Sequence, residues 1–165
     1  MSLGIKRTRP LRVALKTFEG TLADVGREFD NLYAWTRRRN LRVGEPDSSG
    51  RMGLPWVAVV HDEAGTTPET ARRIDIWIPI ESAGPSQPGY TVKDIPHENV
   101  AFMIHKGPMS RLDESVQQLF TWVEQKQLSA RSRLHRRLYL RGVDGPPEDP
   151  DWEAELQIPL LPVRS

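Results

Sequence analysis

The chain repeats itself at a fixed spacing, and this repeat limits the folds that it can adopt. Four matches lie 87 positions apart: Val13-Ala14 with Val100-Ala101, Gly20 with Gly107, Leu32-Tyr33-Ala34-Trp35 with Leu119-Phe120-Thr121-Trp122, and Leu41 with Leu128. A fifth match, at a spacing of 80, relates Ile78-Pro79-Ile80 to Ile158-Pro159-Leu160. Matches that keep their order along the chain predict that one supersecondary unit occurs twice.

Each copy predicts a strand, a turn at Gly20 or Gly107, a helix and two more strands. The helices are predicted from apolar residues at helical spacing. These are Leu22, Val25, Phe29 and Leu32 in the first copy, and Met109, Leu112, Val116, Leu119 and Val123 in the second. The predicted strands cover 12–18, 56–61 and 73–80, then 99–105, 137–141 and 153–160. This order predicts an α+β fold with a helix over each half of the sheet.

The domain organisation follows from the repeat. We expect one domain over residues 1–165, with module one at about 11–81, a linker at about 82–90 and module two at about 91–162. Two such modules are expected to pack about a pseudo-two-fold axis, with a ligand cleft between them.

Composition excludes several classes of function. Lys and Arg number 23 against 22 Asp and Glu, so the balance of charge argues against direct nucleic-acid binding. The absence of cysteine excludes disulfides and thiol catalysis, and the four histidines show no metal-ligand spacing, so no metal or cofactor is expected. No apolar run approaches the roughly 18 residues of a membrane span. We therefore expect a cytoplasmic protein that does not contact a membrane.

Strand alternation predicts which side chains face away from the helices, because successive residues point to opposite faces. The isoleucines of 73–80 indicate that Asp75 and Trp77 face away, and the apolar residues of 153–160 indicate the same for Glu155. Leu138 and Leu140 are predicted to be core, so Tyr139 is predicted to face away. Val57 and Val59 are predicted to be core, so Trp56 is predicted to face away too.

Carboxylates among aromatic rings on one face indicate a cation-binding surface. A carboxylate in a poorly hydrated cavity attracts a cation, and each ring adds cation–π attraction of roughly 0.5–2 kcal/mol. The residues alone also allow plainer roles. Glu155 could pair with Arg137 or Arg73, Asp75 could pair with Arg72 or Arg73, and the tryptophans could be buried between the two copies.

The second copy resembles the GyrI-like small-molecule-binding domain, a family that includes the effector-binding domains of bacterial multidrug-sensing transcription factors. The segments that carry the resemblance are 100–109, 119–122, 138–140 and 155–160. It implies a cleft that binds bulky, lipophilic, often cationic compounds. It also implies that Glu155 is the acidic anchor, with Tyr139 beside it and Asp75 as its counterpart in the first copy. Met109 departs from the family, in which tyrosine often follows the Gly-Pro pair.

The resemblance favours a stand-alone binding protein over an enzyme. The predicted ligand-binding residues are Glu155, Tyr139, Trp56, Trp77 and Asp75. One alternative is a hydrolase of strained or electrophilic natural products, with Glu155 as general base and Tyr139 as donor. Another is a DNA gyrase inhibitor, which would have a protein partner.

Overall fold

The computed structural model shows, among the residues that it describes, one antiparallel sheet of eight strands and two α-helices that cover one face of it. It describes residues 3–21, 24–44, 47–48, 54–61, 72–81, 90–130, 134–141 and 148–161. The elements are β1 (Leu3–Arg7), β2 (Leu11–Gly20), α1 (Val25–Arg38), β3 (Trp56–Val60), β4 (Arg72–Pro79), β5 (Thr91–Ile95), β6 (Asn99–Lys106), the short 3-10 helix η3 (Met109–Arg111), α2 (Leu112–Gln125), β7 (His135–Arg141) and β8 (Glu153–Pro159). The predicted α+β class is confirmed, and each predicted strand is found with ends shifted by at most two residues.

The strand order is symmetric between the two halves of the chain. It runs β1-β6-β8-β7-β3-β4-β2-β5, so exchanging β1–β4 with β5–β8 reproduces the same order read from the opposite edge of the sheet. Helices α1 and α2 have equal lengths and begin 87 residues apart, at Val25 and Leu112. Beyond them, Asn40 and Gln127 adopt the left-handed conformation with φ of 57° and 56°. The repeat in the sequence therefore corresponds to a repeat of local structure. The predicted linker is not assessed, because 82–89 lie outside the described residues.

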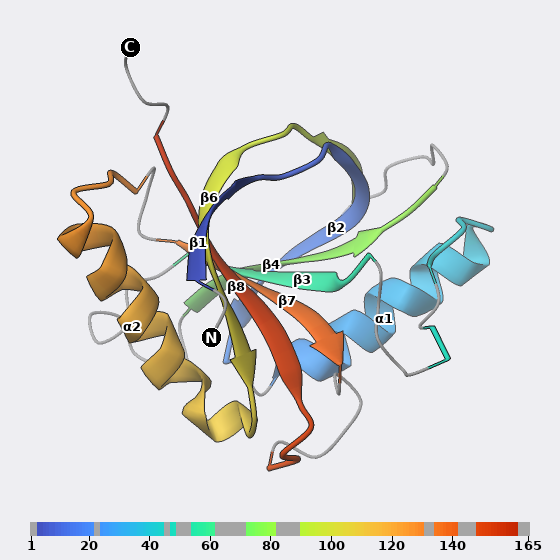
Figure 1. Cartoon of the computed structure of the whole chain (residues 1–165). Coiled ribbons are helices and arrows are strands. Elements are labelled where there is room, and N and C mark those ends of the chain that lie inside the picture. The colour runs from blue at the N-terminus through green and yellow to red at the C-terminus, as the bar shows by residue number, and fades with distance from the viewer. Residues whose placement is uncertain are drawn as a thin grey trace.

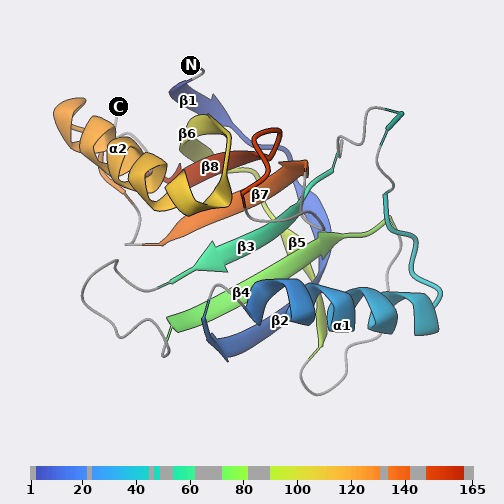
Figure 2. The same cartoon turned by 90° about the horizontal axis from the view of Figure 1, so that it is seen from below.

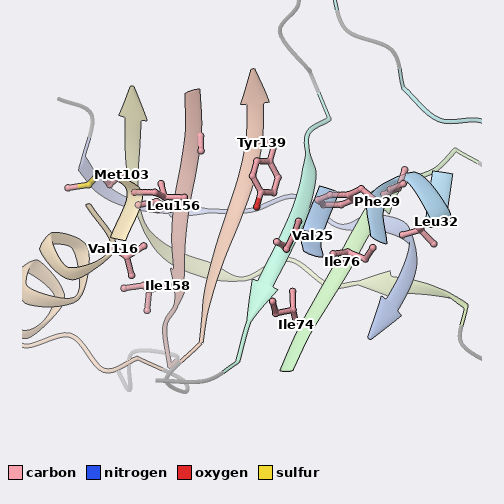
Figure 3. Packing of buried hydrophobic residues seen from close by; sticks show 14 of the residues in the cluster. Val25, Phe29, Leu32, Ile74, Ile76, Met103, Val116, Tyr139, Leu156 and Ile158 are labelled. Carbon is pink, nitrogen blue, oxygen red and sulfur yellow. The ribbon is translucent and has the colours of Figure 1, made fainter. Parts of the chain in front are cut away.

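The main core lies between the sheet and the helices. Figure 2 shows α1 and α2 on the same face of the sheet. Helix α1 buries Val25, Phe29 and Leu32 against β4, while α2 buries Val116 and Leu119 against β6 and β8. Figure 3 shows both groups meeting isoleucines and leucines of the sheet. The helical periodicity in the sequence is thus the packing pattern of these two faces.

Two strands were not predicted, namely β1 and β5. Each pairs with the second strand of the other half: β1 with β6, and β5 with β2. Figure 1 shows the β1–β2 and β5–β6 connections arching over the face of the sheet that lies away from the helices. This second face is therefore partly covered, and residues on it can be buried without touching a helix.

The predicted faces of β3 and β7 are wrong. Tyr139 belongs to the helix-side core, and Trp56 packs against the same cluster. Trp56 pairs directly with Tyr139, and Leu138 pairs with Val57 and with Glu155 on the opposite face. The reason is that both faces of these central strands are covered. Apolar residues occur on both sides, and alternation alone cannot tell them apart.

Candidate ligand-binding hollow

The face away from the helices contains a hollow of about 340 Å³ that spans the junction of the two halves. Val57 and Trp77 come from the first half, and Leu138, Leu140, Glu155 and Gln157 come from the second. Lys6 and other residues of the β1–β2 segment, with Arg136, complete the wall. These residues face the same side because β3, β4, β7 and β8 are paired in register. Half of the lining side chains are apolar, and the polar half includes the cations Lys6, Arg7, Arg9 and Arg136 beside the carboxylate of Glu155. Apolar walls with polar groups at defined positions are typical of small-molecule sites.

Glu155 is the buried carboxylate of the hollow. Its side chain is only 10% exposed. The Lys6 ammonium lies 2.7 Å from each carboxylate oxygen, and Gln157 Nε2 donates a hydrogen bond of 2.6 Å to Oε2. A charged carboxylate at this depth needs such partners. The predicted pairing with Arg137 or Arg73 is replaced by pairing with a lysine of β1.

Lys6 also contacts an aromatic ring. Its Nζ atom lies 4.7 Å from the centroid of Phe102, the neighbouring strand's residue on the same face. The carboxylate of Glu155 and the ring of Phe102 thus form a binding site for a cation, and Lys6 occupies it. The Lys6 side chain is 40% exposed, so the charge of this pair is buried mainly on the glutamate side.

Trp77 forms part of the wall of the hollow, as Glu155 does. The Trp77 ring also contacts a cationic side chain of the protein. The Arg136 guanidinium lies 5.0 Å from the Trp77 ring centroid. Arg136 is buried and forms an ion pair with Glu98, from the segment between β5 and β6. Cation–π contact and ion pairing together hold Arg136 between the two halves.

Asp75 is the counterpart of Glu155 in the first half. Asp75 pairs with Thr17 across strands β4 and β2, as Glu155 pairs with Ile104 across β8 and β6. The Thr17 hydroxyl donates to Oδ1 over 2.5 Å, and His61 Nε2 lies 2.6 Å from Oδ2. Arg73, one of the partners predicted from sequence, lies 4.0 Å from Oδ1. Asp75 is absent from the lining of the hollow, and these neighbours hold its carboxylate.

Tyr139 and Trp56 lie on the other face and cannot reach the hollow. Tyr139 makes edge contacts with Phe29 and Trp152, and Trp56 packs on Phe29 and Tyr33 of α1. Figure 3 shows Tyr139 between the groups of side chains that contact α1 and α2. Burial raises the pKa of the Tyr139 phenol, an effect that the nearby Arg137 charge partly opposes. The predicted face of both residues is thus corrected: Tyr139 is in the core on the helix side, and Trp56 is packed against that core.

Sequence reasoning missed Lys6 and Arg136 as parts of the hollow. Lys6 lies in a basic N-terminal segment without the apolar pattern of a strand. The repeat offered one signal, because it relates Lys6 to Lys93. In the structure the two lysines occupy equivalent positions, since Lys6 pairs with Val100 and Lys93 pairs with Val13.

In the described ranges, no cluster of acidic and histidine side chains could hold a metal ion. None of the helices in those ranges has the length and apolar character needed to cross a bilayer.

Comparison with known proteins agrees with this architecture. The family model of the GyrI-like small molecule binding domain matches residues 1–161. The chain belongs to this family. No curated protein matches the GyrI-like chain by sequence.

Several solved structures have the same fold as this GyrI-like domain. The EcmrR C-terminal domain has a TM-score of 0.80 at 18% identity, over 98% of each chain. In an EcmrR–DNA complex the match covers 98% of this chain but 58% of the EcmrR chain, so this chain spans little more than half of that protein. SAV2435 bound to tetraphenylphosphonium has a TM-score of 0.57 at 12% identity, over 98% and 94% of the two chains. A hydrolase from Listeria innocua has a TM-score of 0.63 at 13% identity, over 95% and 91%.

Proposed function

We propose that this GyrI-like domain binds bulky, lipophilic cations in the hollow, with Glu155 as the anchor. The observation that carries the proposal is the buried Glu155 carboxylate at the wall of a hollow of about 340 Å³ that also offers apolar side chains. That volume lies within the range of small-molecule sites, roughly 300–1,000 Å³. The wall residues Val57, Trp77 and Leu138 offer apolar surface to the body of such a ligand.

The ion pair at the hollow favours a cation over an anion. A cationic ligand would displace Lys6, whose half-exposed side chain can move its charge into water. An anionic ligand that paired with Lys6 would instead draw it away from Glu155 and leave a buried carboxylate without its counter-ion. A buried charge without its counter-ion is destabilising, so an anion at this position makes the less favourable exchange.

The hydrolase alternative is not favoured by the geometry. Both Glu155 oxygens are engaged by Lys6, which stabilises the carboxylate but competes with a water molecule for it. Tyr139, the proposed donor, lies on the far side of the sheet. The Listeria neighbour is similar in fold, and a fold shared at low identity does not carry an activity with it. No described contact supports the gyrase-inhibitor alternative.

The proposal is tested by calorimetric titration with tetraphenylphosphonium, the cation bound by the neighbour SAV2435. We expect Glu155→Gln to weaken binding by about tenfold or more, because the charge of the anchor is lost. Asp75→Asn is the matched control, since it removes the register-equivalent carboxylate that lies outside the hollow. Binding that is equal in all three proteins would refute the anchor role, and no binding to any of them would refute this ligand class.

A further inference from the structure

We infer that Lys6 is a built-in competitor of the ligand, so that a lipophilic cation enters the hollow only by exchange with the Lys6 ammonium. This inference rests on the proposed function and concerns how the same site is regulated. It makes Lys6 a residue that sets both the affinity and the charge selectivity of the hollow.

Lys6 makes the contact with Glu155 that a bound cation would make. Its ammonium lies 2.7 Å from both oxygens of Glu155, and its cation–π partner, Phe102, lies outside the lining of the hollow. Glu155 is the carboxylate of the lining. Lys6 and a ligand cation would therefore both pair with Glu155, and the two cannot do so together.

The position of Lys6 in the fold allows this exchange without disturbing the core. Lys6 lies on β1, at the end of the sheet, and β1 is hydrogen-bonded to β6 on one side only. Its side chain is 40% exposed, whereas that of Glu155 is 10% exposed and is also held by Gln157. Displacement thus moves the more hydrated partner into water and leaves the buried partner in place.

The role of Lys6 as a competitor also explains why the Lys6–Glu155 ion pair can be present in a binding site. Without a ligand, Lys6 compensates the charge that burial would otherwise make costly. With a ligand, the incoming cation takes over that compensation. A hydrophilic monocation gains nothing over Lys6 by the exchange. A lipophilic cation gains the apolar wall of the hollow in addition, and it is selected for that reason.

The matched pair of variants Lys6→Met and Lys93→Met tests the inference. Both remove one positive charge, and the two lysines are equivalent in strand register, but Lys93 does not line the hollow. We expect Lys6→Met to bind tetraphenylphosphonium about three- to tenfold more tightly than the unmodified protein, and Lys93→Met to bind it equally well. The isosteric anion tetraphenylborate should gain no affinity in Lys6→Met.

The salt dependence of the affinity for tetraphenylphosphonium gives a second test. In the unmodified protein one ion pair replaces another, so affinity should change little with salt. In Lys6→Met a pair is only formed, so affinity should fall as salt screens it. A third test needs no variant. Tetraphenylphosphonium should increase the rate at which an acylating reagent modifies Lys6, and peptide mass spectrometry measures that rate.

The possible results separate the inference from the proposed function. If Lys6→Met binds the cation as well as or less well than the unmodified protein, or if Lys6 acylation is unchanged or slower with ligand, the competitor role is wrong while the binding function stands. If Lys6→Met gains affinity equally for the cation and the anion, it has only enlarged the hollow, and the inference is also wrong. If no variant binds the cation, the proposed function fails and the inference falls with it.

Discussion

The ammonium of Lys6 lies 2.7 Å from the carboxylate of Glu155, across a separation of 149 residues along the chain. The contact joins an edge strand of one half to the last strand of the other. It exists because β1 pairs with β6, which in turn pairs with β8. The charge of the hollow is thus set by both halves of the chain together.

The energy of this contact can be measured by a double-mutant cycle. We expect Lys6→Met and Glu155→Gln each to lower the free energy of unfolding by about 1 kcal/mol, since the lysine is partly hydrated. The double variant should lose less than the sum of the two, because the second change no longer leaves an unpaired charge. Urea denaturation measures all four proteins. Strictly additive losses would mean that the two side chains do not interact in solution.

The two faces of the sheet should respond differently to the loss of apolar atoms. Leu156 is fully buried beneath α2, whereas Leu138 is half-buried and lines the hollow. We expect Leu156→Ala to destabilise the protein by about 2–5 kcal/mol, and Leu138→Ala to cost markedly less. Chemical denaturation compares the two variants. Equal destabilisation would contradict the assignment of the main core to the helix side.

Filling the hollow should weaken binding without unfolding the protein. Leu138→Trp adds a large ring at the wall, and we expect about tenfold weaker binding of tetraphenylphosphonium. Leu134→Trp is the control, because Leu134 packs against the same apolar cluster as Leu138 but does not line the hollow. Calorimetry measures both affinities, and thermal melting establishes that both variants are folded. Unchanged affinity in Leu138→Trp would place the ligand elsewhere.

Tyr139 gives a prediction about pH. Its phenol has a pKa raised above 10.0 by burial, so the neutral form is favoured in the folded protein. The stability that depends on this neutral form is complete below the unfolded-state pKa and is lost as pH rises through the folded-state pKa. Tyr139→Phe keeps the ring contacts with Phe29 and Trp152 but cannot ionise.

The melting temperature should therefore fall less steeply in Tyr139→Phe than in the unmodified protein between about pH 9 and pH 11. Binding of tetraphenylphosphonium near neutral pH should be the same in both proteins, because Tyr139 faces the helices. Identical alkaline profiles would contradict the buried phenol. A loss of binding would contradict the placement of Tyr139.

Much of this architecture could be predicted from the repeat, because both copies place apolar residues at the same helix and strand positions. The faces of β4 and β8 were also predictable, since isoleucines alternate with polar residues in one and leucine and isoleucine do so in the other. Trp77 and Glu155 were therefore placed on the correct face. Tyr139 and Trp56 were not, because β7 and β3 are covered on both sides and carry apolar residues on both.

Strands β1 and β5 could not be predicted from apolar periodicity. They are the two end strands of the sheet, and the charged residues Lys6, Arg7, Lys93 and Asp94 interrupt their apolar pattern. Charged residues on end strands protect the sheet from further pairing and remove the apolar signal. The same property hid Lys6, so the partner of Glu155 could be found only from the three-dimensional pairing of β1 with β6.

The most direct test of the account is to locate a bound ligand on one face of the sheet. Nuclear Overhauser contacts can be measured between the aryl protons of tetraphenylphosphonium and the labelled methyl groups of the protein. The account predicts contacts with Leu138 and Val57, which line the hollow. Contacts confined to Ile76 and Leu156, which belong to the core beneath the helices, would contradict it.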